Sequence, residues 1–349
     1  MLRVFVLILI VYISSAYVCP NRNHILIEHQ IFYKLPNITN MEFISEDEFY
    51  VSKVNIIYRY NRTNLVWDIK LSYIIKKIKY YDKKIYIIGN VNNVGFVYII
   101  NKNGKIIFNN MLFININNIY IHKDHFYLTG YKYIDLDQYI YNQSYISQHS
   151  IRKGMIWEKL LYNNSYGLDI IVNDTIYVTG IVDKNTFLIK MNFTDIIWSH
   201  IFEPYHCSKP IGIKMNNDMI SISGWFNFHI KIDNVILKTC GFGNDSYLIT
   251  IDKYSGKILF YGVFCGSHIE VKSFYIDNCF YYVSGTIKII DLNFAFIGTN
   301  LLTNVSNGKY YFDIFYTRSL IDPIIKIIDD YIYILLKQTK NHISRFKII

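Results

Sequence analysis

The chain has 349 residues, of which 52% are apolar and 17% are aromatic, so it can bury a substantial core and is not a disordered tail. Ile occurs 65 times and Ala only twice, and β-branched and aromatic residues outnumber strong helix formers. This bias nearly excludes an all-helical protein. The formal charge of +9 is weak evidence for an anionic partner, because an A/T-rich genome would encode the same excess of Ile, Asn, Lys and Tyr, and we expect no nucleic-acid partner.

The first 16 residues have the pattern of a secretory signal peptide. One cation, Arg3, precedes an apolar run over residues 4–13, and the segment ends in small residues at Ala16. The run is shorter than the roughly 20 residues of a membrane-spanning helix, which favours cleavage over a retained signal anchor. We therefore expect residues 1–16 to be a signal peptide and residues 17–349 to be secreted or displayed outside the cell, with no membrane span after cleavage.

A five-residue pattern, apolar-aromatic-apolar-Ser/Thr-Gly or close to it, recurs along the chain. Its seven copies, of which the first and last are degenerate, are at residues 49–53, 85–89, 126–130, 176–180, 220–224, 281–285 and 332–336. From position 53 to position 336 the mean spacing is about 47 residues, the size of one four-stranded propeller blade. The sequence therefore predicts an all-β fold, a single seven-bladed β-propeller of four-stranded blades over residues 17–349.

The two ends of the chain predict how the ring closes. The seventh repeat leaves room for only one more strand, at residues 343–349, so its blade lacks an outermost strand. Residues 24–32 precede the first repeat and match the outer-strand pattern. We expect this N-terminal strand to complete the last blade, because the pairing would remove two open sheet edges.

Each repeat is followed by an alternating strand, a polar turn and a second strand that carries an aromatic residue. These outer-strand aromatics are Trp67, Phe108, Trp157, Trp198, Phe260 and Phe312. We interpret them as side chains that fill the space between blades, and not as ligand platforms.

N-glycosylation sequons are a second, independent indication of secretion. With 34 Asn and 35 Ser plus Thr, chance alone would give about 3.4 copies of Asn-x-Ser/Thr. The eight observed copies are at Asn37, Asn61, Asn142, Asn163, Asn173, Asn192, Asn244 and Asn304. The repeat map places the first, third, fourth and seventh on one face and the rest on the opposite face, with none inside a strand. The sequence thus predicts a glycoprotein of a eukaryotic secretory pathway.

The repeat resembles the SBBP-type β-propeller repeat, and its last part is similar to the quinoprotein-like propeller repeat. The best copy spans residues 220–264, where Ser223-Gly224-Trp225-Phe226 leads through a long polar insertion to Gly243-Asn244-Asp245-Ser246-Tyr247-Leu248 and Gly256-Lys257-Ile258-Leu259-Phe260. The resemblance implies a propeller fold and leaves the function open, because propellers serve both binding and catalysis. Quinoprotein enzymes use a vicinal Cys pair and a calcium site, which this sequence lacks, so we expect no cofactor.

Five cysteines are an odd number for an oxidising compartment, so at least one is unpaired. The repeat map places Cys207, Cys240 and Cys265 on one face, and Cys19 and Cys279 on the other. We expect a disulfide between Cys207 and Cys240, with Cys240–Cys265 as the alternative pairing and Cys19–Cys279 as a second bond.

Two other polar groups are interpreted as solvated turns. His122-x-x-His125, with Asp124 between, falls in a tight turn and has no fourth ligand nearby in the sequence, so we expect no metal. The basic run Lys76, Lys77, Lys79, Lys83 and Lys84 straddles an inner strand and its turn; the alternative is an anion-binding patch.

One level of the innermost strands is the candidate binding site. Counting ten residues back from the end of each repeat gives Phe43, Lys79, Tyr120, Ile170, Lys214, Tyr275 and Lys326. Innermost strands line the axial channel of a propeller, so the three lysines and two tyrosines of this level would form a cationic rim that could hold a carboxylate, sulfate or phosphate. The alternative is that the lysines only reach channel water from an apolar strand.

Together these patterns predict a monomeric, secreted binding module with an unknown protein or glycan ligand. The alternative is a secreted propeller hydrolase or lyase whose catalytic residues lie in variable loops. An enzyme requires a convergent cluster of carboxylate, His or Arg at the mouth of the ring, whereas a binding module does not.

Overall fold

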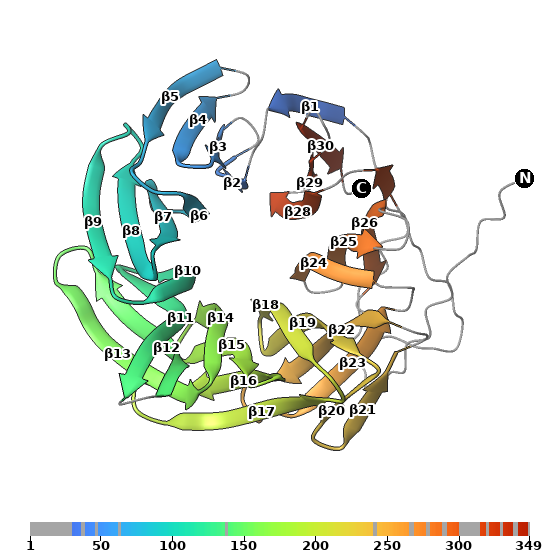
Figure 1. Cartoon of the computed structure of the whole chain (residues 1–349). Coiled ribbons are helices and arrows are strands. Elements are labelled where there is room, and N and C mark those ends of the chain that lie inside the picture. The colour runs from blue at the N-terminus through green and yellow to red at the C-terminus, as the bar shows by residue number, and fades with distance from the viewer. Residues whose placement is uncertain are drawn as a thin grey trace, which may run out of the picture.

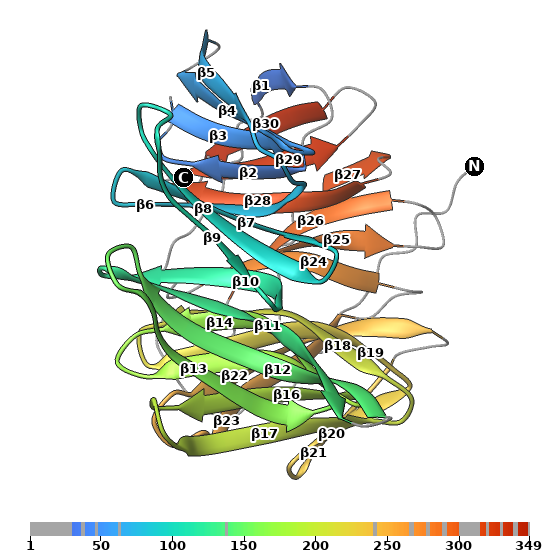
Figure 2. The same ribbon diagram turned by 60° about the vertical axis from the view of Figure 1, so that its left-hand side comes forward.

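The computed structural model describes residues 30–35, 39–45, 48–61, 64–136, 139–239, 243–264, 269–276, 280–287, 292–299, 315–318, 321–328, 331–337 and 341–347. All regular structure within these ranges is β-strand, and the strands form seven antiparallel sheets around a central axis (Figure 1). Successive sheets lie beside one another around this axis (Figure 2). No helix in the described ranges is long and apolar enough to cross a membrane.

The first three sheets each contain four strands that follow one another from the axis outward. Sheet one contains β2 (Asn40–Phe43), β3 (Glu48–Lys53), β4 (Ile56–Asn61) and β5 (Asn64–Lys70). Sheet two contains β6 (Ile75–Tyr81), β7 (Lys84–Val91), β8 (Val94–Asn101) and β9 (Ile106–Leu112). Sheet three contains β10 (Asn115–His122), β11 (His125–Leu136), β12 (Tyr139–Ser150) and β13 (Gly154–Asn163).

The remaining four sheets follow the same order with two variations, described below. Sheet four begins with β14 (Ser165–Val172), β15 (Ile176–Val182), β16 (Asn185–Met191) and β17 (Ile196–Pro204). Sheet five contains β18 (Ser208–Asn216), β19 (Met219–Asn227), β22 (Asn244–Asp252) and β23 (Ile258–Phe264). Sheet six contains β24 (Ile269–Ile276), β25 (Phe280–Ile287), β26 (Leu292–Thr299) and β27 (Phe315–Arg318). Sheet seven contains β28 (Ile321–Ile328), β29 (Tyr331–Lys337), β30 (Asn341–Lys347) and β1 (Gln30–Leu35).

The five-residue repeat forms the second strand of every sheet, which confirms the repeat assignment. Its glycine is required by the close approach of the inner strand. A Cβ at Gly130 would lie 1.8 Å from the carbonyl oxygen of Asn115 on β10, and one at Gly180 would lie 2.0 Å from that of Tyr166 on β14. The repeat therefore marks the place where the inner strand of each sheet packs against the second.

The N-terminal strand pairs with the last strand of the chain, as expected. β1 runs antiparallel to β30, from Gln30 opposite Arg345 to Leu35 opposite Asn341. The strand boundaries differ from the expectation: β1 begins at Gln30, residues 24–29 lie outside the described ranges, and β30 is shifted by two residues from the expected 343–349.

The insertion of sheet five forms a hairpin and not a polar loop. Its strands are β20 (His229–Ile232) and β21 (Val235–Lys238). β20 pairs with β17, with Phe202 opposite Ile232, so this hairpin widens sheet four to six strands. Burial alternates along both strands, and Ile230, Ile232 and Leu237 lie in the cluster between sheets four and five, which holds the hairpin against sheet four.

The outer edges of the ring carry a bulge at one repeated position. In the fourth strand of sheets one to five the register shifts at the second apolar residue, immediately before the outer-strand aromatic. The bulged residues are Val66, Ile107, Ile156, Ile197 and Leu259. A bulge twists an edge strand and interrupts its ladder, so the repeated bulge protects the rim against pairing with other chains.

The outer-strand tryptophans lie against the next sheet, as interpreted from the sequence. Trp67 donates its indole N–H to the carbonyl oxygen of Lys102 at 3.0 Å, in the last turn of sheet two. Trp157 forms an edge-to-face contact with Phe193 of sheet four, at 5.6 Å between ring centroids. These contacts join neighbouring sheets and leave neither ring as a platform for a ligand.

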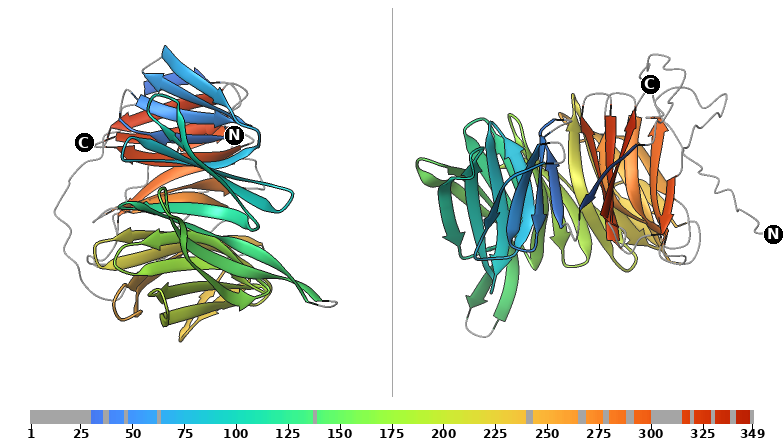
Figure 3. Two further views of the ribbon diagram at one scale, coloured as in Figure 1. Left: turned by 90° about the vertical axis from the view of Figure 1, so that its left-hand side faces the viewer. Right: turned by 90° about the horizontal axis from the view of Figure 1, so that it is seen from above.

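The β11–β12 hairpin extends beyond the other strands and projects from the ring (Figure 3). β10 pairs with β11 only as far as Tyr131, and β13 pairs with β12 only from Gln143. The four residue pairs farther out, from Tyr133–Asn142 to Leu136–Tyr139, form a two-stranded ribbon.

Candidate functional site

The inner strands place one residue of each sheet opposite the second residue of the repeat. These residues are Glu42, Lys79, Tyr120, Ile171, Lys214, Tyr275 and Lys326, and they are called the axial level below. Two of the expected members are therefore wrong, because Phe43 is replaced by Glu42 and Ile170 by Ile171. Counting back by a fixed number failed because the chain between the axial residue and its partner in the repeat is one residue longer in sheet one, and one residue shorter in sheet four, than in sheet three.

The neighbouring level confirms this register. In sheets one to six, the residue immediately before the axial residue, on the opposite side of the inner strand, is apolar and at most 4% exposed: Met41, Ile78, Ile119, Ile170, Ile213 and Phe274. Side chains alternate between the two faces of a strand, so the axial level faces away from this buried set.

Lys214 is a half-buried cation at this level. Its ammonium lies 5.9 Å from the ring centroid of Phe274 on β24. Burial lowers the pKa of Lys214; the carboxylates of Asp169 and Glu42 partly oppose this shift, and the ammonium of Lys79 adds to it. The charges of three other inner strands, β2, β6 and β14, thus act on the Lys214 ammonium.

Asp169 is fully engaged in holding the inner strands together. Its Oδ2 accepts the backbone N–H of Ile213 on β18 at 2.9 Å, and its Oδ1 accepts the N–H of Ile170 at 2.9 Å and an amide N–H of Asn118 on β10. A Cβ at position 212 would lie 2.6 Å from Oδ2, so Gly212 makes room for the carboxylate. The side chain therefore links three sheets and has a structural role.

Three donors of the axial level form no hydrogen bond or ion pair with another described residue: the ammonium groups of Lys79 and Lys214 and the hydroxyl of Tyr120. Burial raises the pKa of Tyr120, with smaller contributions from Tyr81 and Asp169, so the hydroxyl remains protonated. Glu42 is 8% exposed and accepts the N–H of Tyr80 at 3.5 Å. The level is therefore rich in donors, with one buried carboxylate beside them.

The other two residues expected at the axial level are placed only by their strands. Tyr275 lies on β24 opposite Tyr282, and Lys326 lies on β28 opposite Tyr333, at the expected level. Their side chains are outside the described part of the molecule. The contribution of a third lysine stays a prediction.

The basic run over residues 76–84 does not form one patch. Lys76 donates to Asn117 Oδ1 at 2.6 Å and to the carbonyl oxygen of Ile116 at 3.0 Å, and Lys84 pairs with Asp82 at 2.6 Å. Lys79 points instead to the axial level. The lysines of the run therefore have different surroundings and do not act as one charged surface.

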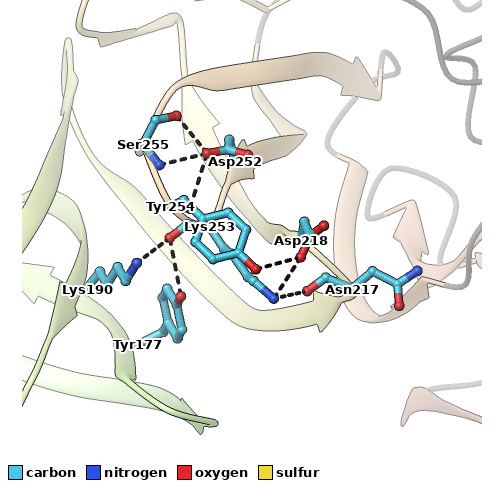
Figure 4. A network of polar contacts seen from close by, with 8 residues as sticks. All are labelled: Tyr177, Lys190, Asn217, Asp218, Asp252, Lys253, Tyr254 and Ser255. Carbon is cyan, nitrogen blue, oxygen red and sulfur yellow. Dashed lines mark hydrogen bonds and ion pairs between the residues drawn. The ribbon is translucent and has the colours of Figure 1, made fainter.

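A brace of polar contacts joins sheets four and five at the turn between β22 and β23 (Figure 4). The carbonyl oxygen of Lys253 accepts the ammonium of Lys190 at 2.6 Å, and the Lys253 ammonium lies 2.9 Å from Asp218 Oδ1. Tyr254 donates its hydroxyl to the same oxygen at 3.0 Å, and these two hydrogen bonds lower the pKa of Asp218. Because its charges are paired internally, we interpret the brace as structural.

His122 and His125 face each other across the turn after β10. Partial burial lowers the pKa of His122, and the nearby Lys123 adds to the shift. Within the described ranges, no three His, Cys, Asp or Glu side chains are placed to hold a metal ion.

Most of the described sequons are exposed. Asn61, Asn163, Asn173 and Asn192 are exposed at strand ends or in turns, and Asn244 is the first residue of β22. Asn37 and Asn304 lie outside the described residues.

The expectation that no sequon lies within a strand is wrong for Asn142. This residue is inside β12 opposite Tyr133, because β11 and β12 continue past the body of sheet three. Its side-chain amide donates to the hydroxyl of Tyr166 at 2.6 Å. The side chain is therefore already engaged within the fold.

Cys207 is a free, half-buried thiol, so the expected Cys207–Cys240 bond is not formed in the structure. Cys207 directly precedes the inner strand β18, whereas pairing with β17 holds the β20–β21 hairpin, which leads toward Cys240, at the outer edge of sheet four. Cys19, Cys240, Cys265 and Cys279 lie outside the described residues, and the other two pairings stay predictions.

Comparison with solved structures identifies the architecture. BamB from Moraxella catarrhalis matches with a TM-score of 0.54 and 10% sequence identity, over 92% of this chain and 100% of that one. The CNH domain of AfRom2 matches with a TM-score of 0.52 and 8% identity, over 92% and 98% of the two chains. The tricorn protease matches with a TM-score of 0.53 and 8% identity, over 95% of this chain and 35% of that one.

The fold is that of a β-propeller. At these identities the likeness concerns the fold alone. No family model and no curated protein matches the sequence, so membership of the SBBP or quinoprotein families is not supported.

Sequence reasoning missed Glu42 and Asp169, two carboxylates on the described inner strands. Asp169 has a visible signal, because it is the only charged residue in the strand of residues 165–172. Gly212 within β18 is a second signal of close approach. Glu42 has no such signal in the sequence, because its position depends on the length of the turn after β2.

Proposed function

We propose that the protein is a secreted, glycosylated interaction module, a single closed propeller of seven blades that binds an anionic group of a protein or glycan at its axis. The observation that carries the proposal is the pair of Lys79 and Lys214. Both ammonium groups lack a hydrogen-bond or ion-pair partner among the described residues, and one of them is desolvated enough for its pKa to fall.

A cation taken out of water without a partner costs free energy, which a bound anion recovers. The two lysines come from β6 and β18, which both border the axis in Figure 1. A carboxylate, sulfate or phosphate placed between them would neutralise both. This arrangement favours anion binding over the alternative that each lysine only extends into the water of the channel.

The geometry gives less support to a hydrolase or lyase. Both oxygens of Asp169 are engaged by hydrogen bonds within the fold, and the raised pKa of Tyr120 keeps its hydroxyl protonated, so neither side chain is placed to take a proton from a substrate. His residues are absent from the described part of the axial level.

The binding claim is tested with the full-length protein secreted from eukaryotic cells, applied to an array of sulfated, phosphorylated and carboxylated glycans and acidic peptides. The double variant Lys79→Met/Lys214→Met should lose about tenfold or more in affinity for any anionic hit, since each lost charge-assisted contact is worth at least about tenfold. Lys105→Met, an exposed lysine in a turn of sheet two, is the matched control for the loss of charge. Undiminished binding by the double variant would contradict an axial site.

Secretion and glycosylation are tested on the same material by mass spectrometry. We expect glycans at the exposed Asn61, Asn173 and Asn192, and a lower occupancy at Asn142, whose amide is bonded within the fold. Finding every sequon bare in secreted protein would overturn the glycoprotein assignment.

A further inference from the structure

Tyr120 distinguishes the axial site from a simple pair of cations. It lies on β10, between the two lysine-bearing strands β6 and β18 in the order of the sheets. Its ring packs against two core clusters, the one between sheets three and four and the one between sheets four and five. The phenol is therefore held in place by the fold and is not a mobile surface side chain.

The Tyr120 hydroxyl remains an available donor. It has no hydrogen-bond partner among the described residues, and burial together with the nearby acidic groups keeps it protonated. With the two ammonium groups, the axial level thus presents three donors from three different inner strands.

We propose that the anion bound at the axis is a tetrahedral oxyanion, the sulfate or phosphate group of a monoester, and that Tyr120 is the residue that selects it over a carboxylate. This inference rests on the proposed function. A sulfate or phosphate ester has three terminal oxygens pointing in three directions, which matches three donors arriving from three sheets. A planar carboxylate has two oxygens and leaves one donor without a partner, which is costly in a partly desolvated site.

Glu42 limits the charge of the preferred ligand. It is buried at the same level, and its carboxylate acts on the Lys214 ammonium. A fully ionised phosphate ester would face this carboxylate with two negative charges and a sulfate ester with one. A phosphate ester is singly charged only below its second pKa, at about 6.

The experiment uses three probes of similar shape, phenyl sulfate, phenyl phosphate and benzoate, titrated into the full-length protein by calorimetry at pH 5.5 and pH 7.5. The wild-type protein should bind both esters about tenfold more tightly than benzoate at pH 5.5. Raising the pH to 7.5 should weaken phenyl phosphate and leave phenyl sulfate unchanged, which separates the two sources of the oxyanion.

Tyr120→Phe removes only the hydroxyl. It should cost about tenfold in affinity for the esters, because only the esters use the third donor, and it should not weaken benzoate, which leaves this donor unpaired. Tyr205→Phe is the matched control, since Tyr205 is an exposed phenol near the outer edge of sheet four. Melting temperatures of both variants show whether the fold is retained.

The outcomes separate the two proposals. If wild-type protein binds none of the three probes, the axial binding function itself is overturned. If it binds all three equally, or if Tyr120→Phe lowers affinity for benzoate as much as for the esters, the anion site stands and the selection by Tyr120 is overturned.

Discussion

A β-bulge occurs both in the fourth strands at the rim of the propeller and in the inner strands at its axis. The residues at the two sets of bulges differ in chemistry. At the rim, the bulge in the fourth strand of sheets one to five always involves an apolar residue, and the bulged side chains of sheets one to four are 38–48% exposed. At the axis, the inner strands of sheets two to six also skip one residue near their start, but the skipped residues differ: Lys76, Asn117, Leu168, Ile211 and Lys272.

The difference shows where the fold is specified and where the chain is free to vary. The bulged residues of the rim are all apolar, because each outer strand has unpaired backbone N–H and C=O groups that must be kept from pairing with another chain. The axial level varies from Lys to Tyr, Ile and Glu, because its side chains meet those of other sheets and not a repeated neighbour. A site that uses several sheets at once can therefore be built at the axis and not at the rim.

The largest expected effect concerns Asp169, which joins three sheets at the axis. Asp169→Ala should lower the free energy of unfolding by about 4 kcal/mol, because it removes charge-assisted hydrogen bonds and leaves the buried N–H of Ile213 without an acceptor. Chemical denaturation of the variant measures the change. Asp174→Ala, in an exposed turn, should change stability by less than about 0.5 kcal/mol.

Gly212 sharpens this prediction through a double-mutant cycle. Gly212→Ala should be destabilising in the wild-type background, where the new Cβ would lie 2.6 Å from Asp169 Oδ2, and cost less in the Asp169→Ala background. Additive effects would show that Asp169 does not hold the position seen in the structure.

A smaller effect is expected at the rim, where Trp157 and Ile156 are adjacent in β13 but have different surroundings. Trp157→Ala should cost about 2 kcal/mol, since the ring packs on Phe193 and on the cluster between sheets three and four. Ile156→Ala should cost less than about 0.5 kcal/mol, because the bulged side chain is 45% exposed. Thermal unfolding compares the two. An Ile156 effect as large as that of Trp157 would mean that the apolar rim is covered by another surface.

The sequence predicted the rim better than the axis, for a physical reason. The repeat, its glycine and the outer-strand aromatic are local patterns that recur in each sheet, so Gly130 and Trp157 could be assigned from spacing alone. The axial level depends on turn lengths, and a difference of one residue moved the assignment from Glu42 to Phe43 and from Ile171 to Ile170. The β20–β21 hairpin was read as a polar loop because its pairing partner, β17, belongs to the preceding sheet. The spacing of the repeat within one sheet does not show which segments of neighbouring sheets pair.

The smallest expected effect concerns Lys214, and its pH dependence tests whether the axis is desolvated. Lys214→Met should raise the free energy of unfolding by about 1 kcal/mol at pH 7, because burial disfavours the charged ammonium and methionine keeps most of the packing. The pKa of Lys214 is lowered in the folded state, so between this lowered pKa and the ordinary value of about 10.4 the unfolded chain binds more protons than the folded one. The stability of the wild-type protein therefore rises with pH in this window, whereas that of the variant does not gain from this group.

The difference in the free energy of unfolding between Lys214→Met and the wild-type protein should therefore shrink as the pH approaches 10. Lys105→Met should leave the free energy of unfolding unchanged throughout. Denaturation curves at pH 7, 8.5 and 10 measure the difference, and an advantage that is constant with pH would place the Lys214 ammonium in water.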